Sequence, residues 1–238
     1  MKIRTLIVGY VLALALFLFA QRHPGSSSPT GFQAVVDLTH SVDARGAYQA
    51  ASSPEQFETR IDAPAYFARG LWTLDQIPAE RLLAPLVVLD VSANIQSHPD
   101  YQVSVEDIAR WERAHSQIPL GSVVIARTGW DSRWRSVKDY RNADRKGTMH
   151  FPGYSPDAAK FLVEGRNAIG VGIDTLSIDY GPSKDFPVRQ YTLAHSVYQL
   201  ENVANLDRAP IAGGTVVVAP AKLESGRSGP VRILALLH

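Results

Sequence analysis

The sequence predicts a single mixed α/β domain, and three observations lead to this fold class. The chain has 238 residues, of which 45% are hydrophobic and 20% charged, the composition of a globular protein with a substantial core. Short β-branched runs recur along it, and segments with helical start signals lie between them. No internal repeat and no second linker follow Phe32, so we expect one domain over residues 32–238.

Six short apolar segments are predicted to be strands. Each is a nearly continuous run of aliphatic and β-branched residues, which is typical of strands that are covered on both faces. The six segments are residues 34–38, 86–91, 122–126, 168–173, 215–219 and 231–237.

Two helices have clear start signals between these strands. Ser104 begins the sequence S-V-E-D, which resembles a capping box, and Ile108 and Trp111 follow at helical spacing. Ser155 and Pro156 supply an N-cap and a proline at the first position of a second helix. Strands that alternate with helices in this way indicate an α/β fold.

The first 31 residues are not expected to belong to the folded body. Lys2 and Arg4 precede an uncharged apolar run at 6–20, and a polar stretch rich in Pro, Gly and Ser follows at 21–31. Such a start is typical of a secretory signal, and the run is short for a spanning helix, which needs about 20 residues. We expect residues 1–20 to be a signal peptide or short membrane anchor and residues 21–31 a flexible tether. A buried N-terminal helix is the remaining alternative.

Charge and cysteine content exclude several functions. The formal net charge is +1, so no strong positive field favours nucleic acid, and we expect a small-molecule ligand instead. The chain has no cysteine, which excludes disulfides, zinc–cysteine sites, iron–sulfur clusters and a thiol nucleophile. A cysteine-free body also suits an oxidising compartment, so we expect an exported protein, periplasmic or secreted.

Three polar stretches are candidate sites. Arg60 and Asp62 lie two residues apart before Ala-Pro, so on an extended chain they share one face; a surface ion pair is the alternative. Residues 172–187 run from a strand end into a loop rich in Gly and Pro, which is a usual place for α/β sites but also fits a simple turn. The third stretch contains His195 and Glu201, for which a helix with an exposed glutamate is the alternative. The residues alone indicate a carboxylate site.

Six motifs, in order along the chain, carry a family resemblance. They are DLTH at 37–40, IDAPAYF at 61–67, TGW at 128–130, MHFPGYSPDAA at 149–159, GIDTLSIDYGPSKDFPV at 172–188 and LENVANLD at 200–207. With them the chain resembles the cyclase family that includes bacterial kynurenine formamidase and isatin hydrolase, over about residues 35–236. The resemblance implies an α/β domain of the swivelling β/β/α type, a homo-oligomer, and arylformamidase-like hydrolysis of N-formyl or cyclic amide bonds.

The sequence departs from this family at the residues that would hold a metal. The resemblance implies the pattern H-x-G-T-H-x-D-x-P-x-H, with a later His and Glu that complete a divalent metal site. Asp62 and Glu201 match the acidic positions. The histidine positions are occupied by other residues, in chain order Gln56, Arg60, Tyr66 and Arg189.

We expect the two arginines to fill the emptied metal site. Arginine offers no lone pair and cannot ligate a metal, whereas two buried carboxylates without a metal need another cation. Each guanidinium is expected within hydrogen-bond distance, about 3.2 Å, of Asp62 or Glu201. The alternative is that Arg60 and Arg189 point into solvent. No cofactor is expected. If an ion binds, Gln56, Asp62 and Glu201 are weak ligands, and zinc or manganese is expected only where the conventional site is retained.

The expected catalytic residues are two carboxylates, a tyrosine and a histidine. Asp62 or Glu201 is the expected general base, Tyr66 the expected proton donor, and His195 a further group for proton transfer. These roles give a hydrolase that works without the usual metal.

The expected substrate-binding residues are mostly cationic or aromatic. Arg60 and Arg189 are expected to bind an oxyanion or a substrate carboxylate. His150 and Trp72 are further candidates, with a satisfied loop histidine and a core tryptophan as the alternatives. Two other functions stay open: a non-catalytic protein that binds a small carboxylate, and a metal-dependent formamidase whose ligands include His150 and His195.

Overall fold

The computed structural model describes residues 31–41, 57–95 and 98–238. The expected signal peptide or anchor and nearly all of the expected tether lie outside these ranges, as does Gln56. None of the helices within the ranges is both long enough and apolar enough to span a membrane. The interpretations of the N-terminal segment therefore stay predictions.

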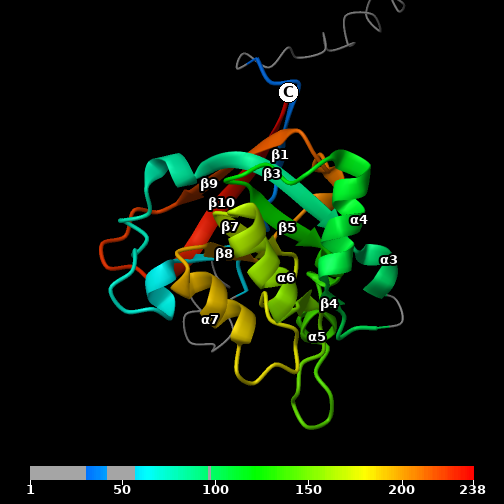
Figure 1. Ribbon diagram of the computed structural model, residues 1–238. Coiled ribbons are helices and arrows are strands. Elements are labelled where there is room, and N and C mark those ends of the chain that lie inside the picture. The colour runs from blue at the N-terminus through cyan, green and yellow to red at the C-terminus, as the bar shows by residue number, and fades with distance from the viewer. Residues whose placement is uncertain (1–30, 42–56, 96–97) are drawn as a thin grey trace, which may run out of the picture.

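Eight strands form one mixed sheet, and seven of them close into a barrel (Figure 1). The strands are β1 (Ala34–Asp37), β2 (Arg60–Asp62), β3 (Leu83–Asp90), β5 (Val123–Arg127), β7 (Gly170–Ile173), β8 (Tyr198–Glu201), β9 (Gly214–Pro220) and β10 (Ser228–Leu237). The barrel order is β10-β2-β8-β7-β5-β3-β9, and it closes because β9 also pairs with β10. β1 pairs with β10 beyond the end of β2. The prediction of one mixed α/β domain is confirmed, and the closed barrel is added to it.

All six predicted strands are present, as β1, β3, β5, β7, β9 and β10. Burial on both faces is confirmed for β5, β7 and the centre of β3, which run parallel. It is wrong for β1, in which Val36 is the one buried residue, and for β9 and β10, in which buried and more exposed residues alternate because one face of each strand is open to solvent. The sequence did not predict β2 and β8, nor the small parallel pair β4 (Gln102–Val103) and β6 (Gly153–Tyr154).

Helices pack on the outside of the parallel strands (Figure 1). The helix α4 (Val105–His115) begins at Ser104 as predicted, where Ser104 and Asp107 form a capping box. The second predicted helix, α6 (Pro156–Lys160), begins at Ser155 and continues as a wider π-helical turn. The remaining helices and helical turns are α3 (Ser92–Ile95), α5 (Val137–Arg141), α7 (Pro187–Ala194), Pro64–Tyr66, Ala79–Arg81, Trp130–Arg133, Phe161–Gly165 and Leu206–Arg208.

Two hydrophobic clusters lie on opposite faces of the barrel wall. In β5, Val123 and Ile125 belong to the cluster inside the barrel, whereas Val124 belongs to the cluster beneath the helices. This alternation follows from the two-residue period of a strand. On β7 the inner cluster needs a glycine, because a Cβ on Gly170 would lie 2.5 Å from the ring of Tyr198.

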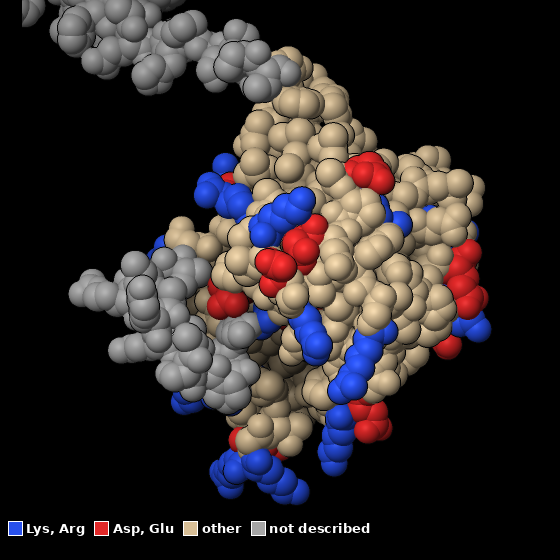
Figure 2. Space-filling model, turned by 90° about the vertical axis from the view of Figure 1, so that its left-hand side faces the viewer, with Lys and Arg blue, Asp and Glu red and all other residues tan. Residues whose placement is uncertain are grey.

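The surface charge is mixed. Figure 2 shows one face of the molecule, on which Lys and Arg side chains lie among Asp and Glu side chains. Exposed ion pairs such as Arg113 with Glu106, at 2.7 Å, contribute only about 0–1 kcal/mol each. Other charged groups, among them Asp62 and Glu201, lie in the interior.

Candidate active site

Three neighbouring strands and one helix bring the candidate residues together. β2 lies between β8 and β10, with Arg60 opposite Glu201 and Asp62 opposite Ser228. Glu201 is therefore buried in a strand, and the alternative of an exposed glutamate on a helix does not apply. The helix α7 packs against β8 and supplies Arg189.

Two buried carboxylates and two largely buried guanidinium groups form one network here. Arg189 Nη2 donates to Glu201 Oε1, and its Nη1 lies 3.7 Å from Asp62 Oδ2. On the other side of Asp62, Arg60 Nη2 lies 3.4 Å from Oδ1 and donates to Ser228 Oγ, which donates to that same Oδ1. Asp62 and Glu201 are 1% and 2% exposed, so paired charges take the place of water in this network.

The two arginines meet the sequence expectation to different degrees. Arg189 hydrogen-bonds directly to a carboxylate, as expected. Arg60 lies just beyond the expected distance of about 3.2 Å and reaches Asp62 through Ser228 instead. The alternative that both point into solvent does not apply, since their side chains are 12% and 13% exposed.

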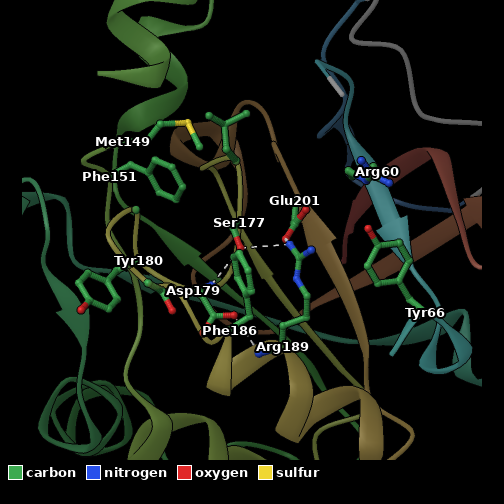
Figure 3. Close-up of a pocket in the computed structure, with 13 residues that line it drawn as sticks. Arg60, Tyr66, Met149, Phe151, Ser177, Asp179, Tyr180, Phe186, Arg189 and Glu201 are labelled. Carbon is green, nitrogen blue, oxygen red and sulfur yellow. Dashed lines mark hydrogen bonds and ion pairs between the residues drawn. The ribbon is translucent and has the colours of Figure 1, made fainter. Parts of the chain in front are cut away.

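A cavity of about 270 Å³ opens beside the network (Figure 3). Figure 3 shows Met149 and Phe151 on one side of it and Tyr66 and Arg60 on the other, with Glu201 between them. The wall thus combines apolar surface with a few charged and hydroxyl groups, which is the usual make-up of a small-molecule site.

The head group of Arg189 is held from several sides. Its Nη2 donates to Ser177 Oγ at 3.1 Å, and its backbone N–H donates to Asp179 Oδ2 at 3.0 Å. Its central carbon lies 5.7 Å from the ring centres of both Tyr66 and Phe186. Aromatic faces attract a cation at this distance. The guanidinium is therefore fixed in position on the cavity wall.

Protonation of the network depends on Glu201. Burial raises the pKa of Glu201 to about 7; the charge of Arg189 opposes this rise and that of Asp62 adds to it. Burial acts to lower the pKa of Arg189, but the charges of Glu201 and Asp62 outweigh it and raise that pKa. Glu201 can thus exchange a proton near neutral pH while Arg189 stays charged.

Comparison with known proteins places the chain in a family. The family model described as "Putative cyclase" matches residues 36–180. This chain belongs to the cyclase family. Isatin hydrolase of Roseibium aggregatum is 32% identical over 191 residues, which cover 77% of this chain and 72% of that protein. Kynurenine formamidase of Salinibacter ruber is 25% identical over 174 residues, 73% of this chain and 72% of that protein.

Solved structures of the family share the fold. Isatin hydrolase A from Labrenzia aggregata, bound to benzyl benzoate, superposes with a TM-score of 0.76 at 30% identity, over 86% of this chain and 93% of that one. An isatin hydrolase bound to the product analogue thioisatinate gives a TM-score of 0.72 at 29% identity, over 85% and 81%. The closed barrel with its helices is thus an architecture of the cyclase family.

The described residues of the site do not fit the divalent ion that the family resemblance implies. In the ranges that the structure describes, no group of three or more His, Asp or Glu side chains is placed to hold a metal. Asp62 and Glu201 are the acidic groups that the two guanidiniums contact, and a guanidinium offers no lone pair to a metal. Gln56 lies outside the described residues, so its role as a ligand stays a prediction.

Three other predicted site residues lie away from the cavity wall. His195 is exposed, and its Nδ1 lies 2.7 Å from the Tyr191 carbonyl oxygen. Trp72 packs against the cluster inside the barrel. His150 lies on a loop, with Nδ1 2.7 Å from Asp100 Oδ2. His150 and His195 do not join Asp62 and Glu201, as a conventional metal site built from them would require.

The sequence did not predict several residues of the site, among them Ser177, Phe186 and Ser228. Ser177 and Phe186 fall within the stretch 172–187 that it singled out, so part of the signal was present. Ser228 gave no signal, because it reaches Asp62 only through the pairing of β10 with β2. Within residues 172–187, Asp174 accepts hydrogen bonds from Thr128 and Gly129 of the segment after β5, a contact between two segments that are distant in sequence.

Proposed function

We propose that this chain hydrolyses an amide bond in a small cyclic or N-formylated compound. Relatives named isatin hydrolase and kynurenine formamidase, at 32% and 25% identity, support this reaction class. The cavity of about 270 Å³ supports a small substrate, and the rings of Tyr66, Phe151 and Phe186 on its wall support one with a flat apolar part.

One observation carries the proposal: a carboxylate of raised pKa lies on the cavity wall beside a fixed cation. Glu201, whose pKa burial raises to about 7, takes a proton from a water molecule while that water attacks the substrate carbonyl carbon. A C–O bond forms, and negative charge develops on the carbonyl oxygen. Arg60 or Arg189 stabilises this charge, since both line the cavity and both are permanently charged.

Tyr66 is the proposed proton donor for the leaving group. When the C–N bond breaks, the nitrogen needs a proton, and the Tyr66 side chain lines the same cavity. The proton that Glu201 took from water then restores Tyr66, so the protein returns to its starting state. Asp62 interacts with both Arg60 and Arg189 and is proposed to hold them in place rather than to act as the base.

Location and assembly complete the proposal. We propose that residues 1–20 export the body, which the basic start, the apolar run and the absence of cysteine support. Family membership supports a domain of the swivelling β/β/α type and, separately, assembly into a homo-oligomer. The mixed surface charge supports a small-molecule partner rather than nucleic acid.

Turnover of isatin and N-formylkynurenine, measured with and without a chelator, tests this function. We expect activity that the chelator does not remove, with kcat/KM rising through about pH 7 as Glu201 loses its proton. Glu201→Gln should lower kcat by about 10²–10⁴-fold. The control Glu106→Gln removes an exposed carboxylate that pairs with Arg113 and should change kcat little. An active Glu201→Gln variant contradicts the assigned base.

A non-catalytic carboxylate-binding protein is the second candidate, favoured by the pairing of Glu201 with Arg189. A carboxylate held by a guanidinium is a weaker base, and guanidinium groups on a cavity wall also suit the carboxylate of a ligand. Tight binding of an aromatic acid such as benzoate in calorimetry, without turnover of any amide or lactone tested, favours this candidate.

A further inference from the structure

Two buried acidic groups lie side by side in the wall of the cavity. Asp62 and Glu201 are almost completely buried, and burial of an ionised carboxylate is unfavourable unless a cation accompanies it. Two cations of the described chain, Arg60 and Arg189, lie within ion-pair distance. When both carboxylates are ionised, the two positive and two negative charges cancel, as they would with one divalent ion between the carboxylates.

The contacts resemble those of a bridging ion. One guanidinium, that of Arg189, contacts both carboxylates, with Nη2 bonded to Glu201 and Nη1 3.7 Å from Asp62. The second, that of Arg60, lies 3.4 Å from the other oxygen of Asp62 and shares Ser228 with it. Asp62 is thus approached by a cation at each of its oxygens.

We propose that Arg60 and Arg189 are a built-in replacement for a divalent cation, so that the chain neutralises this site without a metal. A divalent ion placed between the carboxylates would meet two fixed positive charges within a few ångströms, which opposes its binding. The replacement is a property of charge and contact alone. It holds whether or not the chain hydrolyses amides, and its test needs no substrate.

Exchange of the two arginines for histidine should turn the site into a metal site. The double variant Arg60→His/Arg189→His removes both cations and leaves two imidazoles and two carboxylates, a suitable set of four donors for zinc. The backbone pairing of residue 60 with Glu201, and the contacts of Arg189 with both carboxylates, show that positions 60 and 189 lie near both acidic groups.

The matched control is Arg110→His/Arg113→His on the exposed face of α4, which makes the same change in charge and adds the same two imidazoles. Zinc and manganese are titrated into the original chain and both variants, with bound metal counted by elemental analysis after dialysis. We expect the site variant to bind one ion per chain at least about 100-fold more tightly than the control and the original chain.

Circular dichroism shows whether the site variant is folded, so that each result of the metal titration can be interpreted. If the site variant is unfolded without metal, refolding on addition of zinc supports the proposal, because binding and folding are then linked. A folded site variant that binds metal no better than the control overturns it. An unfolded site variant that neither zinc nor manganese refolds also overturns the proposal. A stoichiometric zinc or manganese ion bound to the original chain overturns it as well.

Discussion

The guanidinium group of Arg189 lies between two buried carboxylates and two aromatic rings. It hydrogen-bonds to Glu201 and Ser177 and lies 3.7 Å from Asp62. A buried ion pair of this kind adds little stability when compared with apolar residues, yet removal of one partner is costly because the other charge stays buried. The free energy of unfolding of a variant in which Glu201 lacks this partner is therefore the informative quantity.

Arg189→Met should lower the free energy of unfolding by about 3–5 kcal/mol near pH 8, where Glu201 is ionised. The loss should shrink at about pH 5.5. The pKa of Glu201 is already raised to about 7 by burial, and without the guanidinium it rises further, so the carboxyl takes up a proton and the uncompensated charge disappears. Urea unfolding at the two pH values measures this difference.

The control is Arg232→Met, which removes an exposed partner of Asp37. It should cost only about 0–1 kcal/mol and show little dependence on pH over this range. Equal losses for the two variants, or a loss at Arg189 that grows as the pH falls, contradict the role of Glu201 as a buried charge.

At this scale the sequence predicted the charged residues but not their hydroxyl partners. Arg60, Asp62, Arg189 and Glu201 were identifiable because their types stand at positions of a family motif. Ser228 was not, because a serine near a C-terminal strand has no pattern of its own, and its contact arises from register alone. Hydrogen bonds between segments that are distant in sequence depend on the tertiary fold. The local spacing of residues therefore does not predict them.

At the scale of elements, one loop connects a surface histidine to the cavity. The segment 142–151 folds back on itself through a bridge between Ala143 and Met149, and Met149 and Phe151 line the cavity. Between them His150 lies 2.7 Å from Asp100 and 3.8 Å from Asp144. The loop is thus tied down by an imidazole between two carboxylates.

His150→Gln should lower the melting temperature more near pH 5.5 than near pH 8.5. The hydrogen bond with Asp100 raises the pKa of His150, and the charges of Asp100 and Asp144 add to this rise. A raised histidine pKa contributes stability that is fully present below the unfolded value of about 6.5 and is lost as the pH rises through the folded value. His195→Gln is the control, since that ring bonds to a carbonyl rather than a carboxylate. The same loss at both pH values contradicts the ionic tie.

The parallel strands β5 and β7 were predictable from the sequence, whereas β2 and β8, two strands of the site, were not. β5 and β7 are continuous apolar runs, so their composition alone marks them. β2 and β8 carry charged or amide side chains at Arg60, Asp62, Gln199 and Glu201, and their strand conformation comes from pairing with neighbours on both sides. Strand propensity depends on such context more than helix propensity does.

At the scale of the whole molecule, the barrel wall joins two hydrophobic clusters. Ile125 is fully buried inside the barrel, and Leu162 is fully buried between the wall and the helices. The same strands contribute to both clusters, so loss of packing on one face of the wall also weakens support for the other.

Ile125→Ala and Leu162→Ala should each lower the free energy of unfolding by about 2–5 kcal/mol, through lost burial and the cavity left behind. Because the clusters share the wall, both variants should unfold in one transition that has the same midpoint by far-ultraviolet circular dichroism and by tryptophan fluorescence. Separate midpoints in either variant contradict a single cooperative unit.

The sequence did not predict that the sheet closes into a barrel. The fold class follows from strands that alternate with helices, but closure needs β10 to pair with both β9 and β2, which come from opposite ends of the body. β2 is only three residues long, and its local pattern does not predict which strands it pairs with. Pairing over such distances is decided by packing of the complete core.

Elemental analysis of the chain, purified without chelator, tests most directly whether side chains have replaced a metal in this cavity. We expect no stoichiometric zinc, manganese or other divalent ion, since the carboxylates of Asp62 and Glu201 are already neutralised by Arg60 and Arg189. One tightly held divalent ion per chain, lost together with activity on chelation, contradicts the proposal that Arg60 and Arg189 have replaced a metal.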